Sequence, residues 1–344
     1  MLIKTKPSSA SCNEEIYISY LLSEPQYTSC TRLAEIMENV SHDSINRFLE
    51  RERFEPKDLF EEERNKIELA GGVLSVDDSV LDKPYSDPKK ASFIDYFWSG
   101  KHKAVVKGIN LISLFYTDIH GVSVPVNYRI CDKKSGKTKN DYFREMLIEV
   151  LSWGLIPAWV TGDSWYSSLE NLKFIRGEKL NFMFGIENNR VVSIERGKYI
   201  QVQKFEGWTS QDIETVYLKD YGMVKVCRQL YKKEYRYYIM STADLNNLDS
   251  LTEIDFNRVH DAHWDIERFH RAIKQVCNVE HFHVRNENPI RNHIFCALKA
   301  FVNLEFLRMD NSISHWYEVK RNLYTKVIRE YILDRTKPEF VVNA

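Results

Sequence analysis

The chain has 344 residues, of which 43% are hydrophobic, with 48 Lys and Arg against 49 Asp and Glu. This composition excludes a disordered chain and argues against a general nucleic-acid coat, and no run approaches the roughly 18 apolar residues of a membrane span. The first twelve residues lack the apolar core of a signal peptide and the six cysteines form no C-x-x-C pair, so we expect a cytoplasmic protein without a membrane partner.

The first part of the chain, residues 16–69, has the composition of helices. Leu33 and Ile36 have helical spacing within Thr31–Met37, and Ser41 can cap a second helix. Two short helices around a tight turn resemble a helix–turn–helix motif, whose second helix could enter a DNA major groove. A plain helical hairpin that packs on the core fits equally well. We expect a helical DNA-binding region over residues 1–70.

From Gly71 the pattern changes to strands that alternate with helices. Apolar runs predict strands at 73–76, 104–116 and 122–130, which form an antiparallel meander. A helix capped by Asn140, a strand at 158–161, a helix at 167–175 and a strand at 181–186 follow. This order of elements predicts the first part of a ribonuclease-H-like core over residues 71–187.

The remaining sequence predicts a β-rich insertion over residues 188–250, followed by long helices. These helices are expected at 257–277, 289–307 and 314–333, so that residues 251–344 hold the second part of the core and the C-terminal helices. The fold class is therefore mixed α/β: a ribonuclease-H-like core with a β-rich insertion, an N-terminal helical region and C-terminal helices.

Three acids stand where such a fold would bring them together. Asp77 ends the first strand, Asp163 follows the fourth, and Glu267 lies on the helix after the insertion. Each has an ordinary structural explanation as a turn residue, a helix cap or a surface charge, but strands disfavour Asp and cores exclude it. Three carboxylates can hold two Mg²⁺ or Mn²⁺ ions, which activate water and stabilise a departing 3′ oxygen. Asp78 replaces Asp77 as a ligand if the strand register shifts by one.

The motifs around these acids resemble those of bacterial insertion-sequence DDE transposases that carry a β insertion between the second Asp and the Glu. The resemblance covers about Gly71 to Leu307: a strand ending in D-x-S at Asp77, a strand ending in Asp163 before Trp-Tyr-Ser-Ser, and the last two members of the signature Y-x2-R-x3-E-x6-K at Glu267 and Lys274. It implies Asp77, Asp163 and Glu267 as catalytic metal ligands. It also implies DNA strand cleavage and strand transfer, and a hairpin intermediate as one route to the second-strand cut.

The signature departs from the family at its first two positions. His260 and His263 stand where the family has Tyr and Arg. With Glu267, Arg271 and Lys274 they lie on one stripe of the helix, so we expect the two histidines and these two cations to contact DNA phosphates. His263 would do so best when protonated, with a pKa raised by phosphate and nearby acids. An exposed, salt-bridged helix is the alternative.

Further DNA contacts are predicted from the basic and aromatic residues. Residues 101–140 hold eight Lys and Arg against two acids, and a second cluster runs from Lys225 to Arg236 with Lys232 and Lys233. The resemblance also implies that Trp208 in the insertion holds an unstacked base near the transposon end, although a lone Trp in a β segment is more often part of a core.

The resulting hypothesis is a metal-dependent transposase that acts on double-stranded DNA, both transposon ends and target, and works as a homodimer because an element has two ends. It would be bacterial, in the cytoplasm and associated with the nucleoid. The alternatives are a nuclease or junction resolvase with the same acids, and an inactive transposase-derived DNA-binding protein. A glycosidase with paired carboxylates is a more distant one.

Overall fold

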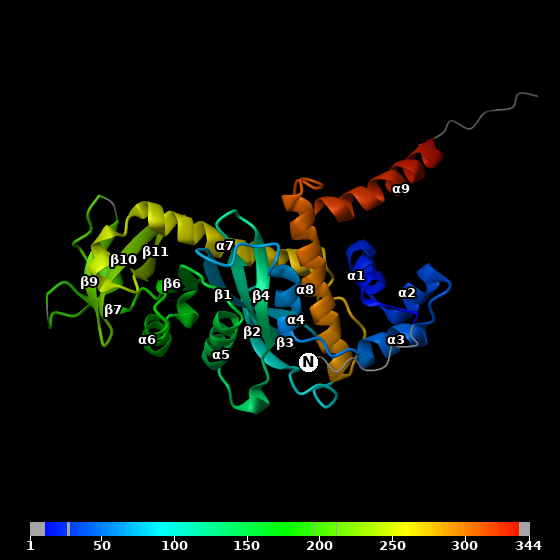
Figure 1. Cartoon of the computed structure of the whole chain (residues 1–344), viewed down its shortest axis with the longest axis horizontal. Coiled ribbons are helices and arrows are strands. Elements are labelled where there is room, and N and C mark those ends of the chain that lie inside the picture. The colour runs from blue at the N-terminus through cyan, green and yellow to red at the C-terminus, as the bar shows by residue number, and fades with distance from the viewer. Residues whose placement is uncertain (1–10, 26–27, 196, 211, 337–344) are drawn as a thin grey trace, which may run out of the picture. The chain divides into compact units, whose positions relative to one another are not determined.

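The computed structural model describes residues 11–25, 28–195, 197–210 and 212–336 (Figure 1). The chain divides into two compact units. One unit comprises residues 55–270, and the other combines residues 1–54 with residues 271–344.

The first unit is built on one mixed sheet in the order β2-β3-β1-β5-β6-β11-β10-β9-β7-β8, with β4 paired to β3. Its strands are β1 (Val73–Asp82), β2 (Asp95–Ser99), β3 (Ala104–Thr117), β4 (Ser123–Ile130), β5 (Trp159–Gly162), β6 (Asn181–Ile186), β7 (Val191–Ser193), β8 (Ile200–Gln201), β9 (Ile213–Leu218), β10 (Gly222–Tyr231) and β11 (Glu234–Ser241). β1 and β4 pair antiparallel with β3, whereas β5 pairs parallel with both β1 and β6. The predicted meander, the parallel crossovers and the mixed α/β class are therefore confirmed.

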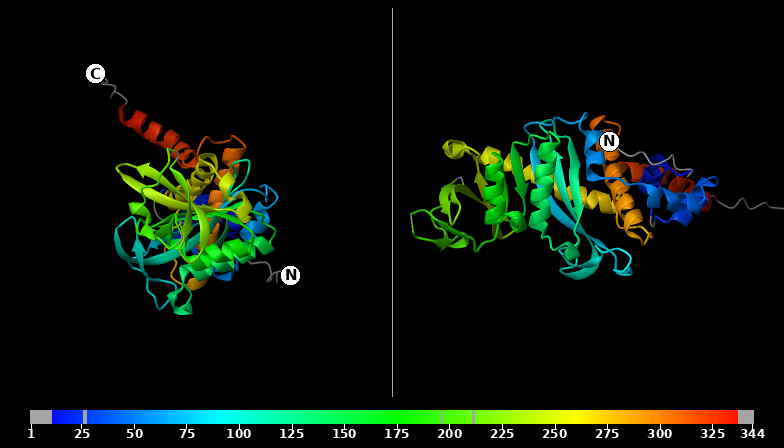
Figure 2. Two further views of the ribbon diagram at one scale, coloured as in Figure 1. Left: turned by 90° about the vertical axis from the view of Figure 1, so that its left-hand side faces the viewer. Right: turned by 60° about the horizontal axis from the view of Figure 1, so that its bottom comes forward.

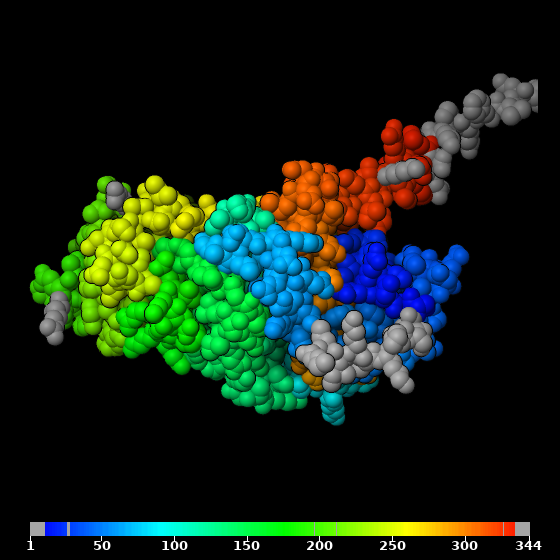
Figure 3. All heavy atoms as spheres, viewed as in Figure 1, coloured from blue at the N-terminus to red at the C-terminus, as the bar shows by residue number. Residues whose placement is uncertain are grey.

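Helices cover the sheet on both faces. They are α4 (Pro56–Glu63), α5 (Lys139–Ser152), α6 (Leu169–Gly177) and α7 (Glu253–Gln275), with short 3-10 helices at Lys133–Ser135, Ser164–Tyr166, Val202–Lys204 and Leu245–Ser250. α5 and α6 lie side by side on one face, and α7 crosses the other (Figures 1 and 2). The first turns of α7 lie at the surface, where Figure 3 draws them in yellow, and Ile254 is 79% exposed.

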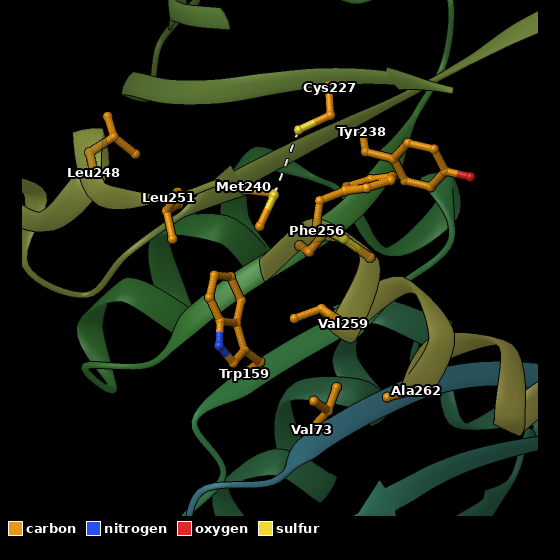
Figure 4. Packing of buried hydrophobic residues seen from close by; sticks show 11 residues of the cluster. Val73, Trp159, Cys227, Tyr238, Met240, Leu248, Leu251, Phe256, Val259 and Ala262 are labelled. Atoms are coloured by element: carbon orange, nitrogen blue, oxygen red, sulfur yellow. Dashed lines mark hydrogen bonds between the residues drawn. The ribbon is translucent and has the colours of Figure 1, made fainter. Parts of the chain in front are cut away.

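α7 is held on the sheet by an apolar cluster that joins the core strands to the insertion. Val259 of α7 packs with Trp159 of β5 and with Met240 of β11, and all three side chains are buried (Figure 4). Burial of each such side chain contributes roughly 1.5–3 kcal/mol, so this cluster fixes α7 relative to the strands. The β-rich insertion thus extends the core sheet, because β11 pairs antiparallel with β6.

Two local predictions were wrong in this unit. The first strand does not end at Asp77: β1 continues to Asp82, because β3 pairs with it along its whole length. Asn140 does not cap α5. Thr138 does, since its hydroxyl accepts from the Asp141 amide while the Asp141 carboxylate accepts from the Thr138 amide.

The second unit is helical, with α1 (Glu14–Ser23), α2 (Cys30–Met37), α3 (His42–Arg51), α8 (Glu287–Met309) and α9 (Glu318–Thr336). The predicted pair of short helices is confirmed as α2 and α3, and Ser41 caps α3 by accepting from the Ser44 amide. Both α1 and α3 pack on α8, which is buried along most of its length. No helix in the described ranges is long and apolar enough to cross a membrane.

Candidate active site

The register of two parallel strands sets the position of the first two acids. Val76 of β1 pairs with Gly162, the last residue of β5, so Asp77 and Asp163 are the next residues on neighbouring strands. Gly162 allows the strands to approach, because a Cβ there would lie 2.8 Å from Val76 Cγ1 and 2.9 Å from Phe184 Cε1. The two aspartates therefore emerge at the same level of the sheet.

Asp163 lies in a strongly negative environment. Its carboxylate caps the following 3-10 helix by accepting from the Trp165 amide at 3.0 Å. Loss of water around the carboxyl, together with the negative charges of Asp77 and Asp78, raises its pKa to about 7. Such crowding of carboxylates is typical of sites that bind divalent cations.

Asp77 is tied to α7 by a histidine. His270 Nδ1 lies 3.3 Å from Asp77 Oδ2, and both side chains are largely buried. Asp77 Oδ1 accepts from the Asp78 amide at 2.7 Å. Burial favours a higher pKa for Asp77, but the hydrogen bond and charge of His270, aided by His263, hold that pKa below its ordinary value. Asp77 is therefore ionised at neutral pH.

Asp78 points to the opposite side of β1 from Asp77, as alternation in a strand requires. Lys139 of α5 donates to both of its oxygens at 2.8 and 2.7 Å, Asn110 donates at 2.6 Å and the Tyr166 hydroxyl at 3.1 Å. This set of partners gives Asp78 a structural explanation: it anchors α5 to the sheet. Asp77 lacks these partners and faces α7 instead, where it meets His270.

Glu267 of α7 and Asp163 both line a pocket of about 380 Å³, and Asp77 is not part of this lining. Its wall is completed by the signature histidines and by β11 residues, and its lining is Gly162, Asp163, Ser164, Gly185, Ile186, Glu187, Asn188, Tyr235, Arg236, Tyr237, Tyr238, His260, His263, Trp264 and Glu267. Among the described residues, no three His, Cys, Asp or Glu side chains already surround a common point as metal ligands would.

One protein-family model matches most of the chain. Residues 70–302 match the family model described as the transposase DDE domain. The chain belongs to this family. No curated protein sequence matches it.

The fold of this family member also resembles a solved transposase. The structure of the piggyBac transposase in a synaptic complex with hairpin DNA aligns with a TM-score of 0.50 at 15% identity, covering 98% of this chain and 77% of that one. The strand transfer complex of the Drosophila P element transposase aligns at 10% identity over 98% of this chain and 89% of that one, but its TM-score of 0.26 is too low to support a shared fold.

The two signature histidines of this transposase-family chain are not charged at neutral pH. Loss of water lowers the pKa of His263 to about 4; the charge of Asp77 opposes this, and His260 adds to it. Burial also lowers the pKa of His260, which stacks on Phe256 and meets Tyr238 edge-on. In the protein without DNA the pKa of His263 is therefore lowered, and the expected rise would require a bound phosphate.

The predicted phosphate contacts at the end of α7 fall in the second compact unit. Arg271 is exposed, and Lys274 lies 3.0 Å from Glu280 in an ion pair. Both residues keep the helical spacing from Glu267 that the sequence predicts, since α7 is continuous from Glu253 to Gln275.

The two basic clusters are less available to DNA than their sequences indicate. In residues 101–140, Lys139, Lys101 and Lys137 pair with Asp78, Asp82 and Glu145. The second cluster is divided, because Lys225 and Arg228 are three residues apart in β10 and face opposite ways. Both are paired as well, Lys225 with Asp249 and Arg228 with Asp212.

The hairpin tip and the tryptophan of the insertion differ in exposure. Lys232 and Lys233 form the exposed turn between β10 and β11. Trp208 is half-buried, packs edge-on against Phe205 at 5.0 Å, and has the Arg228 guanidinium 4.7 Å from its ring centroid. Trp208 is therefore already in contact with the insertion's own side chains.

Sequence reasoning missed the contact of His270 with Asp77 and the contact of Lys139 with Asp78. His270 follows Glu267 by three residues, so helical spacing places it near Glu267 on α7 and could have marked it. No local pattern identifies Lys139, which reaches Asp78 from a helix 61 residues further along the chain.

The crowding at Asp163 predicts a pH-dependent gain in stability for Asp163→Asn. The folded state holds the Asp163 proton up to a pKa of about 7, whereas the unfolded chain loses it near the ordinary value of 3.8. Stability therefore falls as pH rises between these values. Although the Asp163 carboxyl has lost much of its water, part of the residue is exposed, so solvent partly screens its repulsion by Asp77 and Asp78. We therefore expect a gain of only about 1 kcal/mol at high pH.

The measurement is thermal unfolding of the DNA-free protein in chelator at about pH 5 and about pH 8, on either side of the Asp163 transition. The gain should be larger at the higher pH, and Asp261→Asn, which removes an 87% exposed acid from α7, should show no such trend. If Asp163→Asn and the parent unfolded at the same temperature at both pH values, the raised pKa of Asp163 and its repulsion by Asp77 and Asp78 would be contradicted.

Proposed function

We propose that this chain uses Asp77, Asp163 and Glu267 to cleave DNA at the ends of a mobile element and to join the freed 3′ ends to target DNA. The observation that carries the proposal is the pairing of Val76 with Gly162, which brings Asp77 and Asp163 to one level beside the pocket that Glu267 lines. Membership of the transposase DDE-domain family supports the same reaction.

The three acids fit a site for divalent cations. Their oxygens are the ligands that Mg²⁺ and Mn²⁺ prefer. Loss of water and repulsion by Asp77 and Asp78 raise the pKa of Asp163, and a bound cation would offset both effects. Asp77, Asp163 and Glu267 would hold two such ions. When bound, these ions supply a lowered pKa for the attacking water or 3′ hydroxyl and stabilise the departing oxygen.

Neighbouring residues would position these ligands and the DNA. His270 donates to Asp77 and holds its carboxylate in place, acting as a positioning residue. His260 and His263 are neutral in the free protein, so each can offer one N–H to a phosphate but no charge. The charge would come from Arg271, Lys274, Lys232 and Lys233, while Trp208 would support the insertion near the transposon end.

We further infer that the DNA substrate is double-stranded and that two copies of the chain act together, one for each element end. The helices α2 and α3 would supply a DNA-binding surface in the N-terminal region of residues 1–70. The piggyBac structure contains hairpin DNA, which supports a hairpin route to the second-strand cut here. Such an enzyme would work in the cytoplasm at the nucleoid of a bacterium.

One observation favours a second candidate, an inactive DNA-binding relative of transposases. The family's arginine position holds His263, whose pKa of about 4 leaves it uncharged beside the acids. A chain that lost catalysis would retain the fold and tolerate this exchange.

The deciding experiment is a strand-transfer assay with the purified full chain. The substrate would be a linear DNA that ends in the inverted repeat flanking the gene, and the target a supercoiled plasmid, with Mg²⁺ or Mn²⁺. Cleaved ends joined to the plasmid are the expected result. Cleavage without joining would indicate a nuclease, and binding without cleavage in either metal would indicate the inactive relative.

A further inference from the structure

β2 and the start of β3 form a hairpin (Figure 1). One face of this hairpin carries exposed aromatic side chains. Trp98 pairs with Val105 and Tyr96 pairs with Lys107, so the four side chains share one face, here called the hairpin face. Trp98 is 64% exposed, Val105 60% and Tyr96 57%. Large apolar side chains gathered on one face in this way mark an interaction surface.

The other face of the same hairpin is the one that holds it to the protein. Phe97 and Ser99 are buried, and Lys133 lies over the Phe97 ring and donates to the Tyr96 carbonyl at the free edge of β2. Asp82 anchors the hairpin loop by binding Lys101 and His102. The hairpin is therefore fixed in place, and its aromatic face is not needed for its own packing.

The charge around the hairpin face favours a polyanion. Residues 83–107 contain six Lys and two Asp, with no Arg or Glu, giving a net charge of +4 in a chain whose net charge is −1. Lys107 lies on the face itself, and Lys103 is exposed in the loop at its end. A second copy of this chain is a poorer partner for so basic a surface, and Lys133 obstructs strand addition at the β2 edge.

The spacing of the rings suits unpaired bases. Tyr96 and Trp98 are two residues apart in a strand, about 7 Å, so each ring can stack on a separate base. In a duplex the base faces are covered by their neighbours, whereas a single strand presents them. The face also lies near the site, since Asp82, which pairs with Gly108 beside the hairpin, is five residues, roughly 16 Å, beyond Asp77 on β1.

We propose that the hairpin face binds single-stranded DNA, with Tyr96 and Trp98 stacking on bases and Lys103 and Lys107 contacting phosphates. The inference rests on the proposed function, because it names the form of DNA held beside the cleavage site. A strand freed or unpaired near the cut would be kept from re-pairing.

The test compares binding of a fluorescein-labelled oligo-dT and of a duplex of equal length to the full chain by anisotropy. Trp98→Ala should weaken oligo-dT binding about ten-fold and Trp98→Phe much less, because the phenyl ring still stacks. Neither variant should weaken duplex binding by more than about two-fold. Lys103→Gln and Lys107→Gln should each lower the salt dependence of oligo-dT binding by about 0.7 log units per log unit of salt.

Ile254→Ala, which removes another exposed apolar side chain from the same unit, is the control and should bind oligo-dT like the parent. The inference would be overturned if Trp98→Ala bound oligo-dT like the parent or lost as much affinity for the duplex as for oligo-dT. It would also be overturned if Trp98→Ala changed the oligomeric mass of the protein. Failure of the proposed function is seen separately: a parent chain that never cleaves, but whose oligo-dT binding depends on Trp98, would keep this inference and reject the transposase reaction.

Discussion

Glu267→Gln, Asp77→Asn and Asp163→Asn should each reduce strand cleavage by on the order of 10³-fold or more, because each removes a charged ligand from a site that acts as a unit. Binding of element ends should stay within about three-fold of the parent, since the phosphate contacts remain. The measurement is single-turnover cleavage of labelled end DNA in Mg²⁺ and in Mn²⁺.

The matched control for Glu267→Gln is Asp261→Asn. Both acids lie on α7 and are exposed, but Asp261 does not line the pocket that Glu267 shares with Asp163. Asp261→Asn should therefore cleave like the parent. If Glu267→Gln cleaves as fast as Asp261→Asn, the proposed ligand set is wrong. If only Asp78→Asn, and not Asp77→Asn, abolishes cleavage, the first ligand is misassigned.

His270→Gln should weaken the affinity for Mn²⁺ by about 10- to 100-fold, whereas His270→Asn should keep most of it. The side-chain nitrogen of asparagine lies as many bonds from the backbone as histidine Nδ1, so it can still donate to Asp77. The side-chain nitrogen of glutamine lies as many bonds away as histidine Nε2, so it cannot replace Nδ1. His270 Nδ1, 3.3 Å from Asp77 Oδ2, is the atom in contact with the carboxylate. The contrast between the two amides therefore tests this contact.

Two readouts separate positioning from a general loss of stability. Mn²⁺ binding to the DNA-free protein is followed by electron paramagnetic resonance, and the metal concentration for half-maximal cleavage is measured alongside. Both variants replace a buried imidazole and should unfold at similarly lowered temperatures. Equal Mn²⁺ affinities at equal stability would show that His270 only fills space.

Much of the architecture could be predicted from local patterns. Continuous apolar runs mark β3 and β6, and alternating apolar residues mark β4. The apolar spacing of Phe143, Met146 and Val150 marks α5, because such patterns reflect which side chains face a core. The cap at Ser41 follows from its own hydroxyl and the next turn. The placement of Asp77 on the first strand, Asp163 directly after β5 and Glu267 on α7 could also be predicted. Asp77 and Asp163 stood out because acids in or directly after buried strands have few structural uses.

Only the tertiary structure decided which way these side chains face, what they pair with and whether they are charged. Whether Asp77 or Asp78 faces α7 depends on the register of β1 against β3 and β5, and the neutral state of His263 depends on burial by distant elements. Three of the eight cations in residues 101–140 form ion pairs with Asp78, Asp82 and Glu145. Asp78 and Asp82 lie on β1, outside this stretch of the sequence. Local propensity depends on neighbours in the chain, whereas charge, pKa and exposure depend on partners that meet only when the sheet is assembled.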